Sequence, residues 1–509
     1  MASAPQIGKP GDIRIDELEI NPLSDRDIED IRNIFMELNI YEDLFSPYGI
    51  RGDVLVSDAL GMPRHMPIVG EEVLDFHFHT IGDKTDGEDG GMGEYFKRFS
   101  IHTIENQKQM DPPNQQFYTI GFNSLIIGDN RKKRVLKYYE AKPGDAIVKD
   151  IVENYFQLHS VPGSARVING VSSSKNFEKS TTDFADVEDD ITESSSDVAD
   201  SITCLIPNWY PIDAIAWITE RTISNEKHPR ADYLFYETLL GGKNTGDHFT
   251  GGLHFRSLQE ILKEEPIGLL TMEPSGIGET GEVRAIRKYA ITNWRILHNP
   301  DTLENRIVGM YASKMITHDM ITKKIGGLIQ PEVWSADKPK EPKYKWNYDE
   351  EFDPEEHISD HKMSSLEMKN FNNASVRYDY ENNVTYQCKE SKLFDKQNEE
   401  NLFPEKWIMN RKSILQQLST WILQVTMHGR IDFHVGDIME FNLPSAETAP
   451  LPGTPLQNIH EMYSGKYLVT SIRHQIKANG LMSHLELRKN AWDINYNDSP
   501  TFKEAGAKD

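Results

Sequence analysis

The sequence predicts an α+β protein that is mainly β and is divided into several domains. A chain of 509 residues is too long for a single hydrophobic core, so two to four domains are expected. Apolar and polar residues alternate with a period of two in residues 34–80, which is typical of half-buried antiparallel strands. The block 413–489 begins with a helix that carries Ile414 and Leu418, and paired strands follow it. Between these blocks, several segments have the apolar spacing of helices instead.

Three strand-like runs in residues 34–80 form the first predicted meander. Each run places apolar residues on one face: Met36, Leu38 and Ile40, then Val54 and Val56, then Leu74, Phe76 and Phe78. Glycine and proline separate the runs, as in turns. The alternation continues through residues 95–140, so the first domain is expected to end near Lys142.

The middle of the chain predicts helices beside short strands. In residues 145–158 one helical face carries four apolar residues: Ile147, Ile151, Val152 and Phe156. A second helix is expected from Pro211, with a buried stripe of Ile212, Ile215, Ala216, Thr219 and Ile223. A third is expected after Ser257, which forms a capping box with Glu260. Residues 172–201 are rich in Ser, Thr, Asp and Glu, and this composition predicts a solvated acidic insertion.

The C-terminal block predicts paired strands and a final hairpin. Asn479-Gly480 is a strong signal for a two-residue type I′ turn. That turn fixes a register in which charge meets charge and apolar residues meet mostly apolar ones. The predicted pairs are Arg473 with Glu486, Ile472 with Leu487, and His474 with Leu485.

Composition excludes several classes of protein. The net charge is −25 and no basic block is present, which argues against sequence-independent nucleic-acid binding. The two cysteines, Cys204 and Cys388, cannot build a disulfide framework and favour a reducing compartment. The sequence has no apolar N-terminal run and no 18-residue apolar stretch, so we expect neither a signal peptide nor a spanning helix.

One short motif has the spacing of a metal site. His77 and His79 lie two residues apart on a predicted strand, so both imidazoles can reach one ion. A metal-dependent hydrolase would need further ligands at later strand ends, and no such set can be picked out. We therefore expect Phe76 and Phe78 to face the core, and the two histidines to face water or a partner.

Other motifs match functional patterns by letters alone. Residues 276–281 spell a dinucleotide fingerprint, with Asp301 twenty residues beyond, but the strand and helix that the motif requires are missing. The spacing of Asp83, Asp86, Glu88 and Asp89 does not fit a calcium loop, so we expect a solvated acidic loop, with a weak ion site as the alternative. Residues 241–246 lack the order of a phosphate loop.

Three remaining signals have ordinary interpretations. Arg51-Gly52-Asp53 stands at a strand entry, where Gly and Asp are common turn residues. Asn373 and Asn383 begin glycosylation sequons, which have no meaning without a secretory route. We find no Ser-His-Asp or Cys-His group and no lysozyme-like carboxylate pair. The sequence thus predicts no enzyme activity, no cofactor and no bound metal.

Three blocks together carry a resemblance to a known family. The first holds LNIYEDLF, GDVLVSD and MPIVGEEVLDF. The second holds IPNWYPIDAIAWITERTIS, YLFYETLLGG and HFRSLQEIL. The third begins with IVGMYASKMITHDMITKKI, expected to be a strand entering a second barrel, and continues through residues 413–489. In this order they resemble the central baseplate hub protein of contractile-tailed phages.

The resemblance implies two similar small antiparallel β-barrels of the tail-tube type, a mixed α/β outer domain and insertions. The implied division is an arm (1–10), a first barrel (11–142), an outer domain (143–304) with the insertion 172–201, a second barrel (305–341 with 413–489), an outer-domain insertion (342–412) and a tail (490–509). The stretches 172–201 and 334–410 depart from the family by their length.

The implied function is structural. Family hubs form a homotrimeric ring in the tail baseplate of the virion, assembled in the host cytoplasm. The ring adapts the sixfold tail tube to the threefold spike and lets DNA pass. The implied partners are the tube or a tube-initiator protein, the central spike and baseplate wedge proteins, with no membrane and no stable nucleic-acid binding. Two rivals remain: a peripheral baseplate or secretion-system spike component, and a metal-dependent hydrolase that uses His77 and His79.

Overall fold

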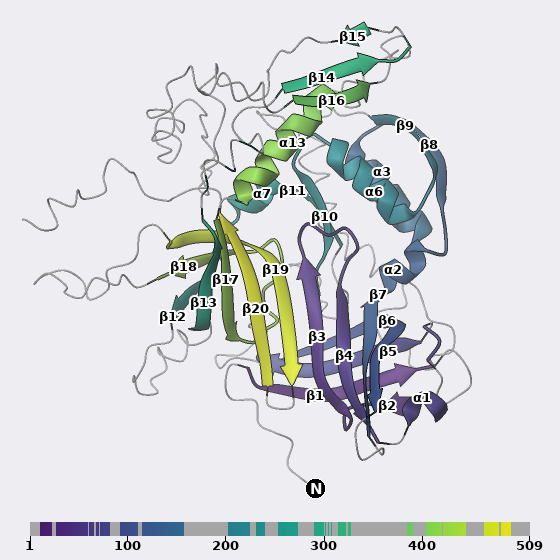
Figure 1. Cartoon of the computed structure of the whole chain (residues 1–509), viewed down its shortest axis with the longest axis vertical. Helices are drawn as coiled ribbons and strands as arrows, with labels where there is room; N and C mark the ends of the chain where they lie inside the picture. Colours follow the sequence, from purple (N-terminus) through teal and green to yellow (C-terminus); the bar gives the residue numbers. More distant parts are fainter. Residues whose placement is uncertain are drawn as a thin grey trace, which may run out of the picture.

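The fold is that of a computed structural model, shown in Figure 1. The structure describes residues 11–22, 27–59, 61–65, 68–70, 72–81, 92–109, 115–156, 202–223, 231–239, 253–272, 290–299, 301, 304, 307, 314–321, 324–326, 384–389, 404–419, 421–443, 463–477 and 480–489. Thirteen strands join in one sheet, in the order β18-β12-β13-β17-β20-β19-β3-β4-β7-β6-β5-β1-β2, and an extra β18–β19 pairing closes one end of it. The prediction of a mainly β protein is confirmed.

The first barrel is a rolled sheet of seven strands. They are β1 (Ile13–Asn21), β2 (Glu29–Asp30), β3 (Phe35–Asp43), β4 (Arg51–Asp58), β5 (Val73–Ile81), β6 (Met92–Gln109) and β7 (Gln116–Ser124). A four-residue helix, α1 (Met62–His65), follows β4. In Figure 1, β1 and β5 run across β3 and β4. The 18-residue strand β6 connects the two layers, because its first half pairs with β5 and its second half with β7.

The core of this barrel follows the predicted alternation. The inward residues of three strands are fully buried: Leu38, Ile40, Val54, Val56, Leu74, Phe76 and Phe78. Met36, which shares their parity, is 47% exposed. The strands form because β-branched and aromatic residues recur on one face, where they pack in a continuous cluster with Phe99, Tyr118 and Phe122.

The second barrel has six strands and closes on itself through β18 and β19. They are β12 (Gly268–Met272), β13 (Ala290–His298), β17 (Trp421–His428), β18 (Ile438–Asn442), β19 (Gly465–Lys477) and β20 (Gly480–Lys489). Strand β12 runs parallel to both of its neighbours. An antiparallel barrel was expected, and this barrel is mixed.

The strands that complete the second barrel differ from those predicted. We expected residues 307–325 to enter it, but β14 (Lys314–Asp319) pairs with β15 (Lys324–Gly326) and β16 (Val384–Lys389) in a separate sheet. Strands β12 and β13, placed by the prediction in the outer domain, take the positions between β18 and β17. They fill the gap in the ring, so no edge is left there for β14.

The outer unit packs helices against two antiparallel pairs of strands. Its elements are α2 (Leu125–Asn130), β8 (Val135–Lys142), α3 (Gly144–Tyr155), β9 (Ile202–Trp209), α6 (Pro211–Arg221), β10 (Tyr233–Glu237), β11 (Leu253–Ser257) and α7 (Leu258–Lys263). Strand β8 pairs with β9, and β10 pairs with β11. The predicted apolar residues Ile147, Ile151 and Val152 of α3 are buried, as is Phe156 at its C-cap. The buried residues of α6 include Ile212, Ala214, Ile215, Ile218 and Thr219. Ala216 and Ile223 of the predicted stripe are only half-buried, and Ile223 lies beyond the end of the helix. Helix α13 (Pro404–Leu418) leads from this region to β17.

The final hairpin forms with a register different from the predicted one. Lys477 pairs with Gly480, so Gly480 belongs to the strand and not to the turn in which it was expected. The observed pairs are Ile472 with Leu485, Arg473 with His484 and His474 with Ser483. Each partner moves by two positions, and a shift of two keeps every side chain on its predicted face.

A glycine is needed at position 480 for a reason other than the turn. Its φ is +138°, and a Cβ at this position would lie 2.8 Å from the carbonyl oxygen of Gly11. That same oxygen accepts a hydrogen bond of 2.7 Å from the amide of Leu481. The glycine therefore allows the start of β1 to approach the hairpin of the second barrel.

The two barrels are joined edge to edge. Strand β3 of the first barrel pairs with β19 of the second along seven residues, from Glu37 with Lys477 to Asp43 with Ser471. Core residues cross this seam, because Ile431, Ile476 and Leu481 pack in the core of the first barrel. The barrels thus share backbone hydrogen bonds and a hydrophobic contact.

No helix among the described residues is long and apolar enough to cross a membrane.

Candidate functional site

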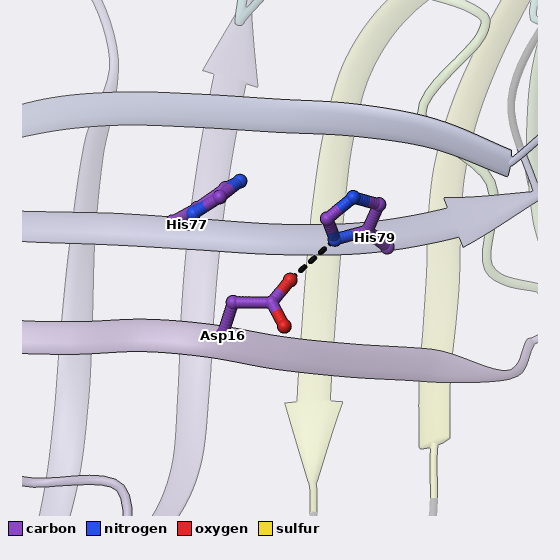
Figure 2. A group of neighbouring side chains, drawn as sticks. All are labelled: Asp16, His77 and His79. Carbon is purple, nitrogen blue, oxygen red and sulfur yellow. Dashed lines mark hydrogen bonds and ion pairs between the residues drawn. The ribbon is translucent and has the colours of Figure 1, made fainter. Parts of the chain in front are cut away.

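A group of potential metal ligands lies on the first barrel. Asp16 of β1 and His77 and His79 of β5 each place one ligand atom within 4.8 Å of the others. Figure 2 shows the three side chains on the neighbouring strands, with Asp16 in contact with Nδ1 of His79. The rings of His77 and His79 are 5.4 Å apart and tilted by 43°. Both histidines face away from the core that holds Phe76 and Phe78, as predicted.

A β-bulge positions the carboxylate. The register pairs Ile15 with Phe78 and then Glu17 with His77, so Asp16 is an extra residue without a direct partner on β5. Bulges of this kind redirect a side chain, and they recur beside functional sites. Here the extra residue brings Asp16 onto the face that carries the two histidines.

A guanidinium completes the surroundings of the cluster. Nε of Arg14 lies 3.0 Å from Oδ1 of Asp16, and Nη2 of Arg14 lies 3.1 Å from Nδ1 of His79. Burial raises the pKa of Asp16, but hydrogen bonds from His79 and Arg14 outweigh it and hold that pKa below its usual value. The carboxylate is therefore charged at neutral pH, and in this structure Arg14 and His79 are its partners.

The sequence marks two of the three residues of this cluster. The His-x-His spacing indicates His77 and His79, but it shows no third ligand, so it predicts no metal site by itself. Asp16 lies 63 residues before His79, and it joins the set only through the β1–β5 pairing. No local signal in the sequence marks it.

A second cluster is buried in the seam between the barrels. Glu42 of β3 is fully buried, and its Oε1 lies 3.6 Å from Nδ1 of His434 and 3.8 Å from Nε2 of His474. Neither carboxylate oxygen has a hydrogen bond among the described residues. Leu38 and Ile40 share the parity of Glu42 on β3, so the alternation itself marked this glutamate as inward-facing.

Another buried carboxylate ties the first barrel to the outer unit. Glu237 of β10 is 3% exposed and lies 3.2 Å from Nζ of Lys97. It accepts hydrogen bonds from the hydroxyl of Ser124 at 2.9 Å and from the amide of Ile50 at 3.1 Å. Three donors from three segments of the first barrel thus converge on a single side chain.

The remaining sequence candidates have structural roles or lie outside the described residues. Gly52 of the Arg51-Gly52-Asp53 motif is buried at the start of β4, and Asp53 accepts a hydrogen bond from Asn39. Asp301 is described and exposed. The glycine motifs, the acidic loop, the sequon at Asn373, Asn383 itself and the insertion 172–201 fall outside the described part. Neither Cys204 nor Cys388 forms a disulfide.

The fold and the sites define a mainly β protein with two fused barrels and a half-buried set of ionisable side chains. No protein-family model matches the chain, and no curated protein sequence matches it.

Solved structures with a similar course of the chain include phage tail proteins. The chain is similar to a tail protein from Neisseria meningitidis at a TM-score of 0.41 and 9% identity, covering 94% of this chain and 97% of that one. It is also similar to a tail protein of prophage MuSo2 from Shewanella oneidensis (TM-score 0.40, 8% identity, 92% and 96% covered). A type VI secretion component from E. coli matches at a TM-score of 0.38 and 7% identity, over 95% and 78% of the two chains. At these scores the likeness does not define what this chain does.

Proposed function

We propose that the protein is a structural component of a contractile phage tail, and that it acts there as the central baseplate hub. Three copies would form a ring between the tail tube and the spike, and DNA would pass through the ring. The observation that carries the proposal is the β3–β19 seam, which fuses two six- to seven-stranded barrels of one chain along their edges.

The seam supports a ring because it fixes the relative orientation of the two barrels. Closed oligomers repeat one interface around an axis. With two barrels per chain, a threefold ring presents six similar units to a sixfold tube. A flexible linker between barrels would not hold such a face, whereas seven paired residues and a shared core do.

Charge supports the passage of DNA through such a ring. Each chain carries a net charge of −25, and negative walls repel phosphate groups, so DNA slides along them without binding. A lumen that proved neutral or basic in the assembled particle would contradict this part of the proposal.

The test is the assembly state of the full chain. We would measure particle mass by mass photometry and then average electron-microscope images. A threefold ring with an open centre is the expected result, in isolation or after addition of tail-tube and spike proteins of the same phage. The partners are included because some rings close only on a partner. A protein that stays monomeric with both partners present would contradict the hub proposal.

A matched variant shows whether the seam carries the ring. In the variant Asn39→Pro, proline interrupts the middle of β3, the strand that pairs with β19 on one side and with β4 on the other. The control Asn123→Pro lies in β7 of the same barrel, away from the seam. The ring should be lost in the first variant and retained in any folded fraction of the second.

A further inference from the structure

We propose that Asp16, His77 and His79 form a binding site for a divalent transition metal ion, with zinc as the best match. The site would bind an ion and cross-link two strands, and no reaction is assigned to it. This inference is independent of the hub proposal, since it rests on three side chains of the first barrel alone.

The geometry brings three ligands of suitable type together. Two imidazole nitrogens and a carboxylate oxygen lie within 4.8 Å of one another. Ligands bound at about 2.0–2.2 Å to one tetrahedral ion lie roughly 3.5 Å apart, so small side-chain rotations bring the set to that spacing. Asp16 is 30% exposed and His79 is 15% exposed, which leaves an ion a path from solvent.

The ligand types select the metal. Imidazole nitrogen suits zinc and neighbouring transition metals, whereas calcium and magnesium prefer sets made entirely of oxygen. Three protein ligands leave one tetrahedral position for water.

Arg14 is the natural competitor for this position. Its guanidinium touches both Asp16 and Nδ1 of His79, so it supplies the positive charge when no metal is bound. The side chain is 27% exposed and long enough to swing toward solvent. A metal ion would displace the Arg14 guanidinium. Removing the guanidinium should therefore tighten metal binding.

The ion would fasten the first strand of the barrel. It would connect β1 to β5, and the chain just before β1 is itself tied to the second barrel by the hydrogen bond from Leu481 to the carbonyl of Gly11. A metal that binds the folded form stabilises it by mass action. Zinc should therefore raise the thermal unfolding temperature.

The experiment uses the full chain after treatment with a chelator, titrated with zinc by calorimetry and with cobalt by visible absorption. The chain has 17 histidines, so weak binding elsewhere is expected and the comparison between variants is the measurement. His77→Gln and His79→Gln should each weaken zinc binding by more than the roughly 10- to 100-fold that loss of a supporting hydrogen bond costs. Arg14→Gln should tighten it, and His102→Gln, in the same barrel, should leave it unchanged.

Two results would overturn the proposal. One is a wild-type zinc affinity equal to that of the double variant His77→Gln/His79→Gln. The other is a wild-type cobalt spectrum without the intense bands of tetrahedral coordination, which requires no variant to fold. If Arg14→Gln binds zinc no better than wild type, the displacement of Arg14 is wrong.

Discussion

Glu42 and His434 form an ion pair in the seam between the barrels, with 3.6 Å between Oε1 and Nδ1. The two residues lie far apart in the chain, on β3 of the first barrel and in the segment between β17 and β18 of the second. Burial favours neutral forms, but the pair outweighs it: the pKa of Glu42 is lowered and that of His434 is raised. The junction of the barrels is thereby linked to pH.

The raised pKa of His434 predicts a loss of stability as the pH rises above 6.5. Burial lowers this pKa, but Glu42 raises it above 6.5, with smaller contributions from Asp437 and Asp432. The folded protein then holds its proton more tightly than the unfolded chain does. This stabilisation is complete below pH 6.5 and is lost as the pH rises through the raised pKa.

The measurement is the free energy of urea unfolding across that range, with hydrogen exchange of the β3 and β19 amides to locate the effect. His434→Gln should show a flatter decline than wild type. The control His318→Gln changes an exposed histidine of β14 and should follow the wild-type curve. Equal slopes for wild type and His434→Gln would show that the pair does not contribute.

His474 predicts the opposite behaviour on the acid side. Burial lowers its pKa to about 4, and repulsion from His434 adds to this effect while Glu42 opposes it. Between pH 4 and 6.5 the unfolded chain takes up a proton that folded His474 refuses, so stability rises with pH across this window. The full effect is on the order of 3 kcal/mol, from about 1.4 kcal/mol per pKa unit.

His474→Gln tests this directly, because glutamine keeps a polar side chain that can contact Ser483, whose hydroxyl lies 3.0 Å from Nδ1 of His474. The variant should lose much of the acid-side slope while its stability near pH 6.5 changes little. An unchanged slope between pH 4 and 6.5 would mean that His474 is protonated in the folded protein.

Gly52 is predicted to tolerate no side chain. A Cβ there would lie 2.2 Å from Cζ of Phe122 and 2.3 Å from the carbonyl oxygen of Asn39. Both neighbours are fixed in β7 and β3, so Gly52→Ala should cost at least about 1–3 kcal/mol through overpacking. Chemical denaturation of the two proteins gives the difference.

Gly128→Ala in α2 is the matched control. Its Cβ would lie 3.6 Å from Oγ of Ser100, an ordinary contact, and alanine is better than glycine in a helix by up to about 1 kcal/mol. Equal stabilities for Gly52→Ala and Gly128→Ala would contradict the close approach at Gly52.

Local pattern predicts the faces of strands but not their partners. The alternation on β5 correctly placed Phe76 and Phe78 inside and the two histidines outside, because the side-chain period of a strand is local. The partner of those histidines, Asp16, depends on the pairing of β1 with β5 and on a bulge. No local rule specifies either feature.

The predictions that differ from the structure, the final turn and the strands of the second barrel, differ for the same reason. Asn479-Gly480 resembles a turn, yet Gly480 is required by the carbonyl of Gly11, a residue at the other end of the chain. The short run Gly268–Met272 joins the second barrel because it fits parallel between β13 and β18. Such placements depend on which edge remains free once the other strands have paired, and that is a property of the whole sheet.

Glu237 and Lys97 are predicted to couple the first barrel to the outer unit. The carboxylate is 3% exposed and the ammonium 11% exposed, so both charges are largely desolvated. Removing one partner of a buried pair leaves the other uncompensated and costs about 3–5 kcal/mol. Glu237→Ala should approach this loss, since it also removes the acceptor of the Ser124 hydroxyl and of the Ile50 amide.

Lys97→Met should cost less, because Glu237 keeps its other two donors. The double variant contains neither the glutamate nor the lysine, so no buried charge is left uncompensated and the two losses should not add. The coupling energy should fall in the range of about 0.5–3 kcal/mol. The exposed pair Arg32 and Asp30 of the same barrel provides a control cycle, for which about 0–1 kcal/mol is expected. A coupling energy for Glu237 and Lys97 no larger than that of the control pair would show that the ion pair does not couple the two units. The hydrogen bonds of Glu237 with Ser124 and Ile50 would then account for the loss in Glu237→Ala.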